Sequence, residues 1–168
     1  METNLHEQNY DRRPIGISGL GGWLVLIQIG LYFTILLLSI QLFKYSLPVF
    51  STDTWDALTS TQSEAYHPMW GPLLIFETVY NIIFLLFSVF ILVIFYGKKR
   101  MFPRLMIIFY SVSLAIGIID LALSYQIPIM RELEDGSSIR ELLKSVIACA
   151  IWIPYLIKSE RVQNTFIR

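Results

Sequence analysis

The stretch "LLIFETVYNIIFLLFSVFILVIFY", residues 73–96, decides how this chain folds. It is apolar along nearly its whole length, and Glu77 is its single charged side chain. A helix needs about 20 predominantly apolar residues to cross the hydrocarbon core of a bilayer, which is about 30 Å thick. The stretch is therefore long enough to cross a membrane, and it predicts a membrane protein.

The whole chain has the composition of a protein whose surface is covered by lipid. Of its 168 residues, 55% are hydrophobic and 15% are charged, and its mean hydropathy is +0.58. Soluble domains have roughly 25% charged residues, so this chain has too little charge to cover a surface that faces water. Its formal net charge is zero, which argues against a nucleic-acid partner. The lipid bilayer is the expected surrounding.

Four segments are predicted to form transmembrane helices, at about residues 22–43, 73–96, 104–126 and 139–157. The fourth contains Lys144 close to its start, where a lysine can extend its ammonium group to the lipid headgroups. Ser138 and Glu141 have the spacing of a capping box, which predicts a helix that begins at Ile139. The expected fold is all-α, a polytopic four-transmembrane-helix bundle in a single membrane domain, residues 1–168.

Lysine and arginine predict the orientation of these helices, because cytoplasmic loops are enriched in both residues. One side of the membrane receives nine of them: Arg12, Arg13, Lys98, Lys99, Arg100, Arg104, Lys158, Arg161 and Arg168. The other side receives four, together with seven acids. We therefore expect both termini in the cytoplasm, as tails at 1–21 and 158–168, and an outer loop at 44–72. The four cations of the loop at 98–104 are expected to set the topology and to attract anionic lipids.

Two acids lie within predicted spans, Glu77 and Asp120. Ionised side chains are costly in a membrane, so each is a candidate functional residue that needs a partner. Both lie near the outer ends of their helices, Asn81 is one turn from Glu77 on the same face, and Lys144 reaches a similar depth. We hypothesise a polar cluster of Glu77, Asn81, Asp120 and Lys144 that faces the bundle interior. Two roles stay open: mutual neutralisation of Asp120 and Lys144 that fixes the helix register, or a site for a proton, ion or ligand.

The residues that usually perform catalysis do not combine in this sequence. The two histidines, His6 and His67, fall in opposite predicted compartments, and the single cysteine, Cys149, falls within the fourth span. This separation excludes a two-histidine metal site and a cysteine–histidine pair. The chain also lacks the G-x-S-x-G elbow of serine hydrolases. We expect no metal, no cofactor and no enzymatic activity.

Three short segments resemble one known family. These are "GLGGWL" at 19–24, "FPRLMI" at 102–107, and "IWIPYLIKSERVQNTF" at 151–166. Together they resemble the domain of unknown function 2569 family of small, four-span bacterial inner-membrane proteins. The resemblance implies a bacterial inner-membrane location and brings no activity with it. It also implies that Arg161, Val162, Thr165 and Phe166 form a real cytoplasmic feature, which caps the inner end of the bundle or docks a partner.

These observations favour a non-enzymatic inner-membrane component, either an accessory subunit or an envelope factor that acts through helix–helix and loop contacts. Its expected partners are the lipid bilayer and either another membrane or envelope protein or a second copy of the chain. Two alternatives stay open. One is an immunity-type protein that protects the membrane from a pore-forming toxin. The other is a small proton- or ion-coupled transporter that uses Glu77 and Asp120.

Overall fold

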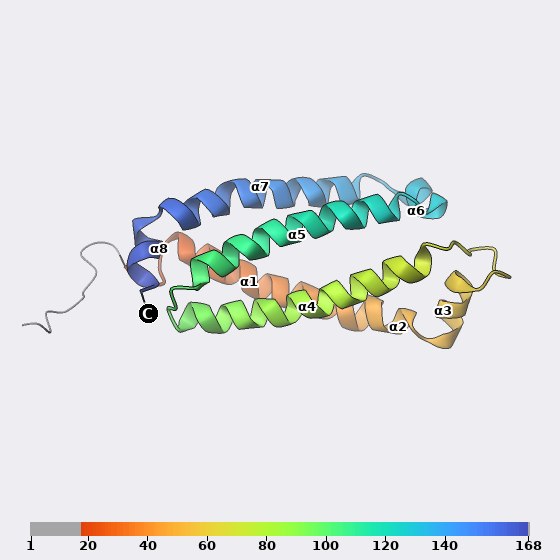
Figure 1. Cartoon of the computed structure of the whole chain (residues 1–168), viewed down its shortest axis with the longest axis horizontal. Coiled ribbons are helices and arrows are strands. Elements are labelled where there is room, and N and C mark those ends of the chain that lie inside the picture. Colours follow the sequence, from red (N-terminus) through yellow and green to blue (C-terminus); the bar gives the residue numbers. More distant parts are fainter. Residues whose placement is uncertain (1–17, 168) are drawn as a thin grey trace, which may run out of the picture.

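The computed structural model describes residues 18–167, and this part of the chain consists of helices joined by short loops (Figure 1). The helices are α1 (Trp23–Ile40), the π-helix η1 (Gln41–Ser46), α2 (Leu47–Val49), α3 (Thr52–Thr59), α4 (Trp70–Tyr96), α5 (Phe102–Ser124), α6 (Pro128–Leu133), α7 (Ser137–Lys158) and α8 (Glu160–Thr165). Nothing between residues 18 and 167 forms a strand, in agreement with the predicted all-α class.

Three helices are long and apolar enough to cross a membrane, namely Trp23–Val49, Trp70–Tyr96 and Phe102–Ser124. The first continues past the expected end at residue 43, because η1 and α2 extend α1 to Val49. The second begins at Trp70, before the expected start at residue 73. Helix α7 has 22 residues but concentrates Arg140, Glu141 and Lys144 in its first two turns. Its role as a fourth span remains a prediction.

The predicted capping box at the start of α7 is wrong. The helix begins at Ser137, and its N-cap is Gly136, whose φ of 83° suits a residue without a side chain. Ser138 donates from both its backbone N–H and its hydroxyl to the Glu134 carboxylate, and the Ser137 N–H donates to Asp135. The Ser138 hydrogen bond is the main cause of the lowered pKa of Glu134. Acids that precede the helix therefore satisfy its first N–H groups, which leaves Glu141 free for another role.

The long helices pack as two pairs. The most extensive contacts are those of α5 with α7 and of α1 with α4, and α4 also contacts α5. The loop between Tyr96 and Phe102 holds the two pairs together at one end of the bundle, where α8 also lies (Figure 1). We call this the α8 end. The opposite end, which bears α3 and α6, we call the loop end.

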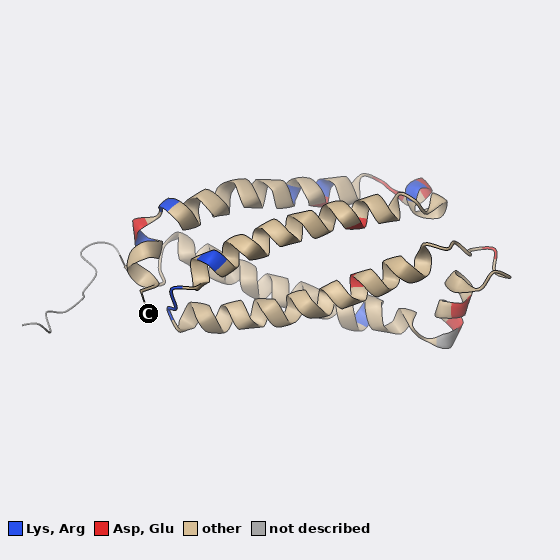
Figure 2. Ribbon diagram, viewed as in Figure 1, with Lys and Arg blue, Asp and Glu red and all other residues tan. Residues whose placement is uncertain are grey.

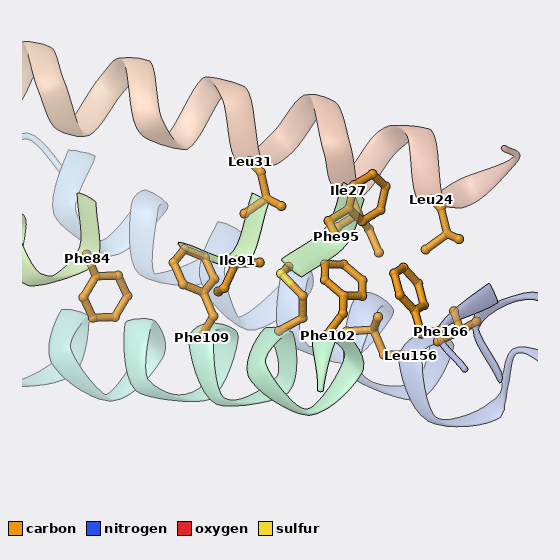
Figure 3. Packing of buried hydrophobic residues seen from close by; sticks show 12 residues of the cluster. Leu24, Ile27, Leu31, Phe84, Ile91, Phe95, Phe102, Phe109, Leu156 and Phe166 are labelled. Carbon is orange, nitrogen blue, oxygen red and sulfur yellow. The ribbon is translucent and has the colours of Figure 1, made fainter. Parts of the chain in front are cut away.

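The hydrophobic core fills the half of the bundle near the α8 end (Figure 3). At the α8 end it contains a group of three aromatic rings. Phe102 stacks on Phe166 with ring centroids 4.3 Å apart, and Phe95 lies 5.0 Å from Phe102 and 5.8 Å from Phe166. Leu24 and Ile27 of α1 pack into the same cluster and are almost completely buried. One apolar cluster therefore joins α1, α4, α5 and the C-terminal segment.

Polar contacts fasten the C-terminal segment to the chain before α1. The Gly19 N–H donates to the Thr165 hydroxyl at 2.9 Å, and this hydroxyl donates to the Gly19 carbonyl at 3.3 Å. The Arg161 guanidinium lies so close to Gly21 and Gly22 that a Cβ added at either would approach it to 3.3 Å. Gly22 also has a φ of +63°, which side chains disfavour. Gly22 is therefore needed where α8 covers the entry to α1, whereas a side chain at Gly21 would require only a small shift of the Arg161 guanidinium.

Truncating Phe166 should loosen the α8 end. Phe166→Ala removes a ring that is only 5% exposed, and we expect it to lower the free energy of unfolding by about 3–5 kcal/mol. The neighbouring Ile167→Ala, at a side chain that is 47% exposed, is the matched control and should change it by less than about 1 kcal/mol. Steric-trap unfolding in bicelles measures both. Equal effects of the two substitutions would contradict the packing described here.

Candidate functional site

The balance of charge differs between the two ends of the bundle, although each end has residues of both signs (Figure 2). Near the α8 end the described residues include six cations: Lys98, Lys99, Arg100, Arg104, Lys158 and Arg161. Near the loop end lie Asp53 and Asp56 of α3, and the acids in and after α6. The loop at 98–104 is therefore at the same end as the C-terminal segment, as the sequence predicts. Arg12 and Arg13 lie outside the described residues.

The described part of the chain contains cavities with volumes of about 190, 500 and 530 Å³. The two larger ones are lined by residues of both helix pairs. The smallest lies mainly between α5 and α7, with Tyr80 as its one residue from α4. Tyr80 of α4 and Glu141 of α7 line all three, so the cavities adjoin one another. Tyr80 lies in the half of α4 nearer the loop end, and Glu141 lies in the first two turns of α7. Together the cavities form what we call the acidic recess. It adjoins the apolar core on the side of the loop end, and two core residues, Phe84 and Phe109, line it.

One lobe of the recess contains acids from three helices. Glu77 of α4, Asp120 of α5 and Glu141 of α7 all line the 500 Å³ cavity. Glu77 and Asp120 are half-buried, whereas Glu141 is exposed and lies at the mouth. The Oδ1 atom of Asp120 is buried and has no hydrogen-bond partner. A buried oxygen without a donor is costly, so this carboxylate favours the arrival of a proton or a cationic group.

The π-helix η1 helps to build the same lobe. Gln41 and Tyr45 line the cavity, and Ser46 accepts a hydrogen bond of 3.4 Å from the Asn81 side-chain amide. Asn81 is only 2% exposed, so this bond satisfies one of its donors. A π-helical turn shifts the direction of side chains along a helix and is frequent at functional sites. Here it brings polar residues of the first long helix against the acids of the others.

The other lobe is mainly apolar. Leu37 and Leu38 of α1, Phe84 of α4, Phe109 of α5 and Ala148 of α7 line the 530 Å³ cavity. An aromatic row connects this lobe with the acidic one. The ring centroids of Tyr80 and Phe84 are 5.5 Å apart, and those of Phe84 and Phe109 are 5.3 Å apart. The recess therefore combines an acidic surface and an apolar aromatic surface that meet at Tyr80.

Glu77, Asn81 and Asp120 of the predicted polar cluster line one cavity, but Lys144 does not join them. Lys144 is exposed and lines the apolar lobe. It donates no hydrogen bond to Oδ1 of Asp120, because that atom has no partner. The carboxylate that α7 contributes to the acidic lobe is that of Glu141.

Sequence reasoning missed Tyr80 and Glu141. Tyr80 lies three residues after Glu77 and directly before Asn81, so helical spacing alone places it near Glu77. The spacing of Ser138 and Glu141 predicts a capping box, and this interpretation leaves no reason to place Glu141 in the polar cluster. Its distance of three residues from Lys144 was the available signal that both side chains lie on one side of α7.

The remaining candidates do not assemble a site. Within residues 18–167, no group of three or more histidine, cysteine, aspartate or glutamate residues is placed to hold a metal ion. His67 accepts a hydrogen bond from the Met69 N–H in the loop before α4, and the Cys149 thiol donates to the Tyr110 carbonyl. His6 lies outside the described residues.

Comparison with known proteins agrees with the motif resemblance. Residues 17–167 match the family described as "Protein of unknown function (DUF2569)". The chain belongs to this family. It is also similar to "Inner membrane protein YdgK" of Escherichia coli (strain K12), with 26% identity over 148 residues, which cover 88% of this chain and 93% of that protein. No solved structure matches the chain. With its apolar helices of membrane length, this DUF2569 member is a multi-pass protein of the inner membrane.

The three segments on which the family resemblance rests meet at the α8 end of this DUF2569 protein. The segment "GLGGWL" contains Gly19, which is hydrogen-bonded to Thr165, and Gly22, which lies against the Arg161 guanidinium. "FPRLMI" supplies Phe102, and the C-terminal segment supplies Phe166, which stacks on it. Val162, Thr165 and Phe166 are buried, and Arg161 is half-buried. The C-terminal segment thus covers this end of the bundle.

Replacing Asp120 by asparagine distinguishes two roles of this carboxylate: structural pairing with Lys144, or a site for a proton, ion or ligand. If Asp120 and Lys144 neutralise each other, removing one charge should cost about 3–5 kcal/mol. The structure instead predicts a change in the free energy of unfolding of less than about 1 kcal/mol, because Oδ1 of Asp120 has no partner to lose. Steric-trap unfolding of Asp120→Asn measures this, with Lys144→Met as the matched variant. A large loss in Asp120→Asn that Lys144→Met reverses would contradict our interpretation.

Proposed function

We propose that this protein is a non-enzymatic accessory component of the inner membrane. It crosses the membrane four times, keeps both termini in the cytoplasm, and takes a ligand with a cationic group into the acidic recess from the outer side. The observation that carries this proposal is that Glu77, Asp120 and Glu141, from three different helices, line a single cavity. The proposed role is binding, and it requires no chemical reaction in the recess.

The division of charge supports the orientation. Lysine and arginine concentrate near the α8 end, and the positive-inside rule assigns such an end to the cytoplasm. The loop end, where the acids of α3 and α6 lie, then faces outward. Helix α7 runs antiparallel to α5 with 22 residues, which is enough to cross about 30 Å. Its early charges lie near the outer interface, where Lys144 can reach the headgroups.

Electrostatics supports a cationic ligand. An uncompensated carboxylate in a membrane is costly, and such groups pair with one another, with cations or with protons. The recess has three carboxylates and, on its apolar lobe, the single lysine Lys144. A cationic group that enters the acidic lobe would reduce this imbalance. An anionic ligand would increase it.

A second candidate is proton- or ion-coupled transport. The observation that favours it is that Glu77 and Asp120 line the same cavity, while the aromatic core closes the bundle near the α8 end. A carrier would require this core to open, and four helices are few for a carrier unless copies associate. We therefore rank binding above transport.

Charged thiol reagents test the orientation and the recess in one experiment. In a Cys149→Ala background, spheroplasts of cells with Ser145→Cys are treated with a cationic or an anionic membrane-impermeant methanethiosulfonate. Ser145 lines two of the cavities, so we expect modification from outside. The ratio of the cationic to the anionic rate should be at least about tenfold larger than the same ratio for a free thiol in solution. Glu134→Cys should also react from outside, and Gln163→Cys only after lysis.

The matched control is Ser88→Cys, because Ser88 lies on the same helix as Tyr80 but is completely buried. It should resist both reagents in intact spheroplasts. Modification of Gln163→Cys from outside would overturn the four-span topology. A rate ratio at Ser145→Cys equal to that of a free thiol would overturn a recess that selects cations.

A further inference from the structure

We propose that the ligand of the acidic recess is an amphipathic organic cation. Its cationic head lies between Glu77 and Asp120, and its apolar body lies against Phe84, Phe109 and Leu38. This inference rests on the proposed function and names the chemical class that the recess would accept.

The size of the recess argues against a bare metal ion. Calcium takes 6–8 oxygen ligands at about 2.3–2.6 Å, and no group of three acids, histidines or cysteines among residues 18–167 converges in that way. The two larger cavities, of about 500 and 530 Å³, fall within the range of about 300–1,000 Å³ that is typical of small-molecule sites. The occupant should therefore be a molecule rather than an ion.

The apolar lobe gives such a molecule a place for its body. Phe84 and Phe109 form a wall with their centroids 5.3 Å apart, and Leu37 and Leu38 of α1 face the same cavity. Burying apolar area contributes about 25 cal/mol per Å². A small hydrophilic cation would leave this lobe unused, so the shape of the recess favours a cation with an apolar body.

The acidic lobe gives the head its partners. Glu77 and Asp120 line the cavity on α4 and α5, and Asp120 also has a buried oxygen without any donor. Tyr80 lines both lobes, so an aromatic ring, a group that attracts cations, lies where they meet. The acidic lobe would therefore hold the cationic head, and the adjoining apolar lobe would hold the apolar body.

Lys144 is a cation in the lining of the recess, so it could instead pair with the head of an anionic amphiphile. It is exposed and lines the apolar lobe, where it is free to extend to the headgroups. A test must therefore compare cations and anions of the same shape. Tetraphenylphosphonium and tetraphenylborate have the same shape and opposite charge.

Equilibrium dialysis of tetraphenylphosphonium against the full chain in phosphatidylcholine nanodiscs tests the proposal, with empty nanodiscs as the blank. We expect saturable binding of one cation per chain. Tetraphenylborate, dialysed in a separate experiment, should show no saturable binding, and millimolar Mg²⁺ should not compete with the cation. Tetramethylammonium, which lacks the apolar body, should bind at least tenfold more weakly. The double variant Glu77→Gln, Asp120→Asn should weaken binding at least tenfold.

A second pair of variants tests the apolar lobe without changing charge. Ala148→Phe adds an aromatic ring at a position that lines the 530 Å³ cavity and should weaken binding of tetraphenylphosphonium at least tenfold. Ala122→Phe makes the same change at an exposed position of α5 that lines none of the three cavities, and it should leave binding unchanged. Thermal unfolding of each variant in detergent verifies that it is folded.

Absence of saturable binding, or equal binding by the recess variants and Ala122→Phe, would overturn the inference. If the thiol reagents still select for positive charge while tetraphenylphosphonium fails, the proposed function stands and only the amphipathic class is wrong. Adding phosphatidylethanolamine to the nanodiscs distinguishes two possible sources of the cation, a lipid headgroup and a free molecule. Competition by this lipid identifies a lipid amine as the occupant, and lack of competition identifies a free amphipathic cation.

Discussion

The stacking of Phe166 on Phe102, at 4.3 Å between ring centroids, is the contact on which the rest of the structure depends. It joins the C-terminal segment to the start of α5, and Phe95 extends the same cluster to α4. Gly19 and Thr165 then tie this cluster to the entry of α1. Lipid tails are as apolar as the side chains, so close packing of this kind, rather than exclusion of water, holds the helices of a membrane protein together.

Close packing at one end has a consequence at the other. The two helix pairs are held together by the core near the α8 end, whereas toward the loop end the two larger cavities lie between them. A membrane helix tolerates ionised side chains where they face a polar cavity instead of lipid. Glu77 and Asp120 occupy that half of their helices, and Ser88 and Phe95 of α4 occupy the packed half. The one charged residue of α4, Glu77, therefore lies in the half with the cavities, whereas the polar residue of the packed half, Ser88, is neutral and donates its hydroxyl to the Phe84 carbonyl.

Much of the fold could be predicted from the sequence. Long apolar runs, helix periodicity and clusters of lysine and arginine between the runs are all visible in short stretches of sequence. The predicted segment 73–96 lies within α4, and the basic loop at 98–104 lies where the sequence suggested. The cavity was only partly predictable. Glu77 and Asp120 stood out because charge is rare in a membrane helix. Glu141 did not, because a glutamate three residues after a serine is equally typical of a helix start. The π-helical turn that brings Gln41 and Tyr45 to the cavity has no local signature in this sequence.

The central claim is that the bundle interior is packed and dry near the α8 end and reachable by water near the loop end. Water-edited solid-state NMR of the unmodified protein in bilayers tests it most directly, because it follows magnetisation as it passes from water to individual residues. The account predicts rapid transfer to Tyr80, Asn81 and Asp120, and slow transfer to Ile91, Phe95 and Phe102. Equally slow transfer to both groups would contradict it, since the acidic recess would then be closed to water.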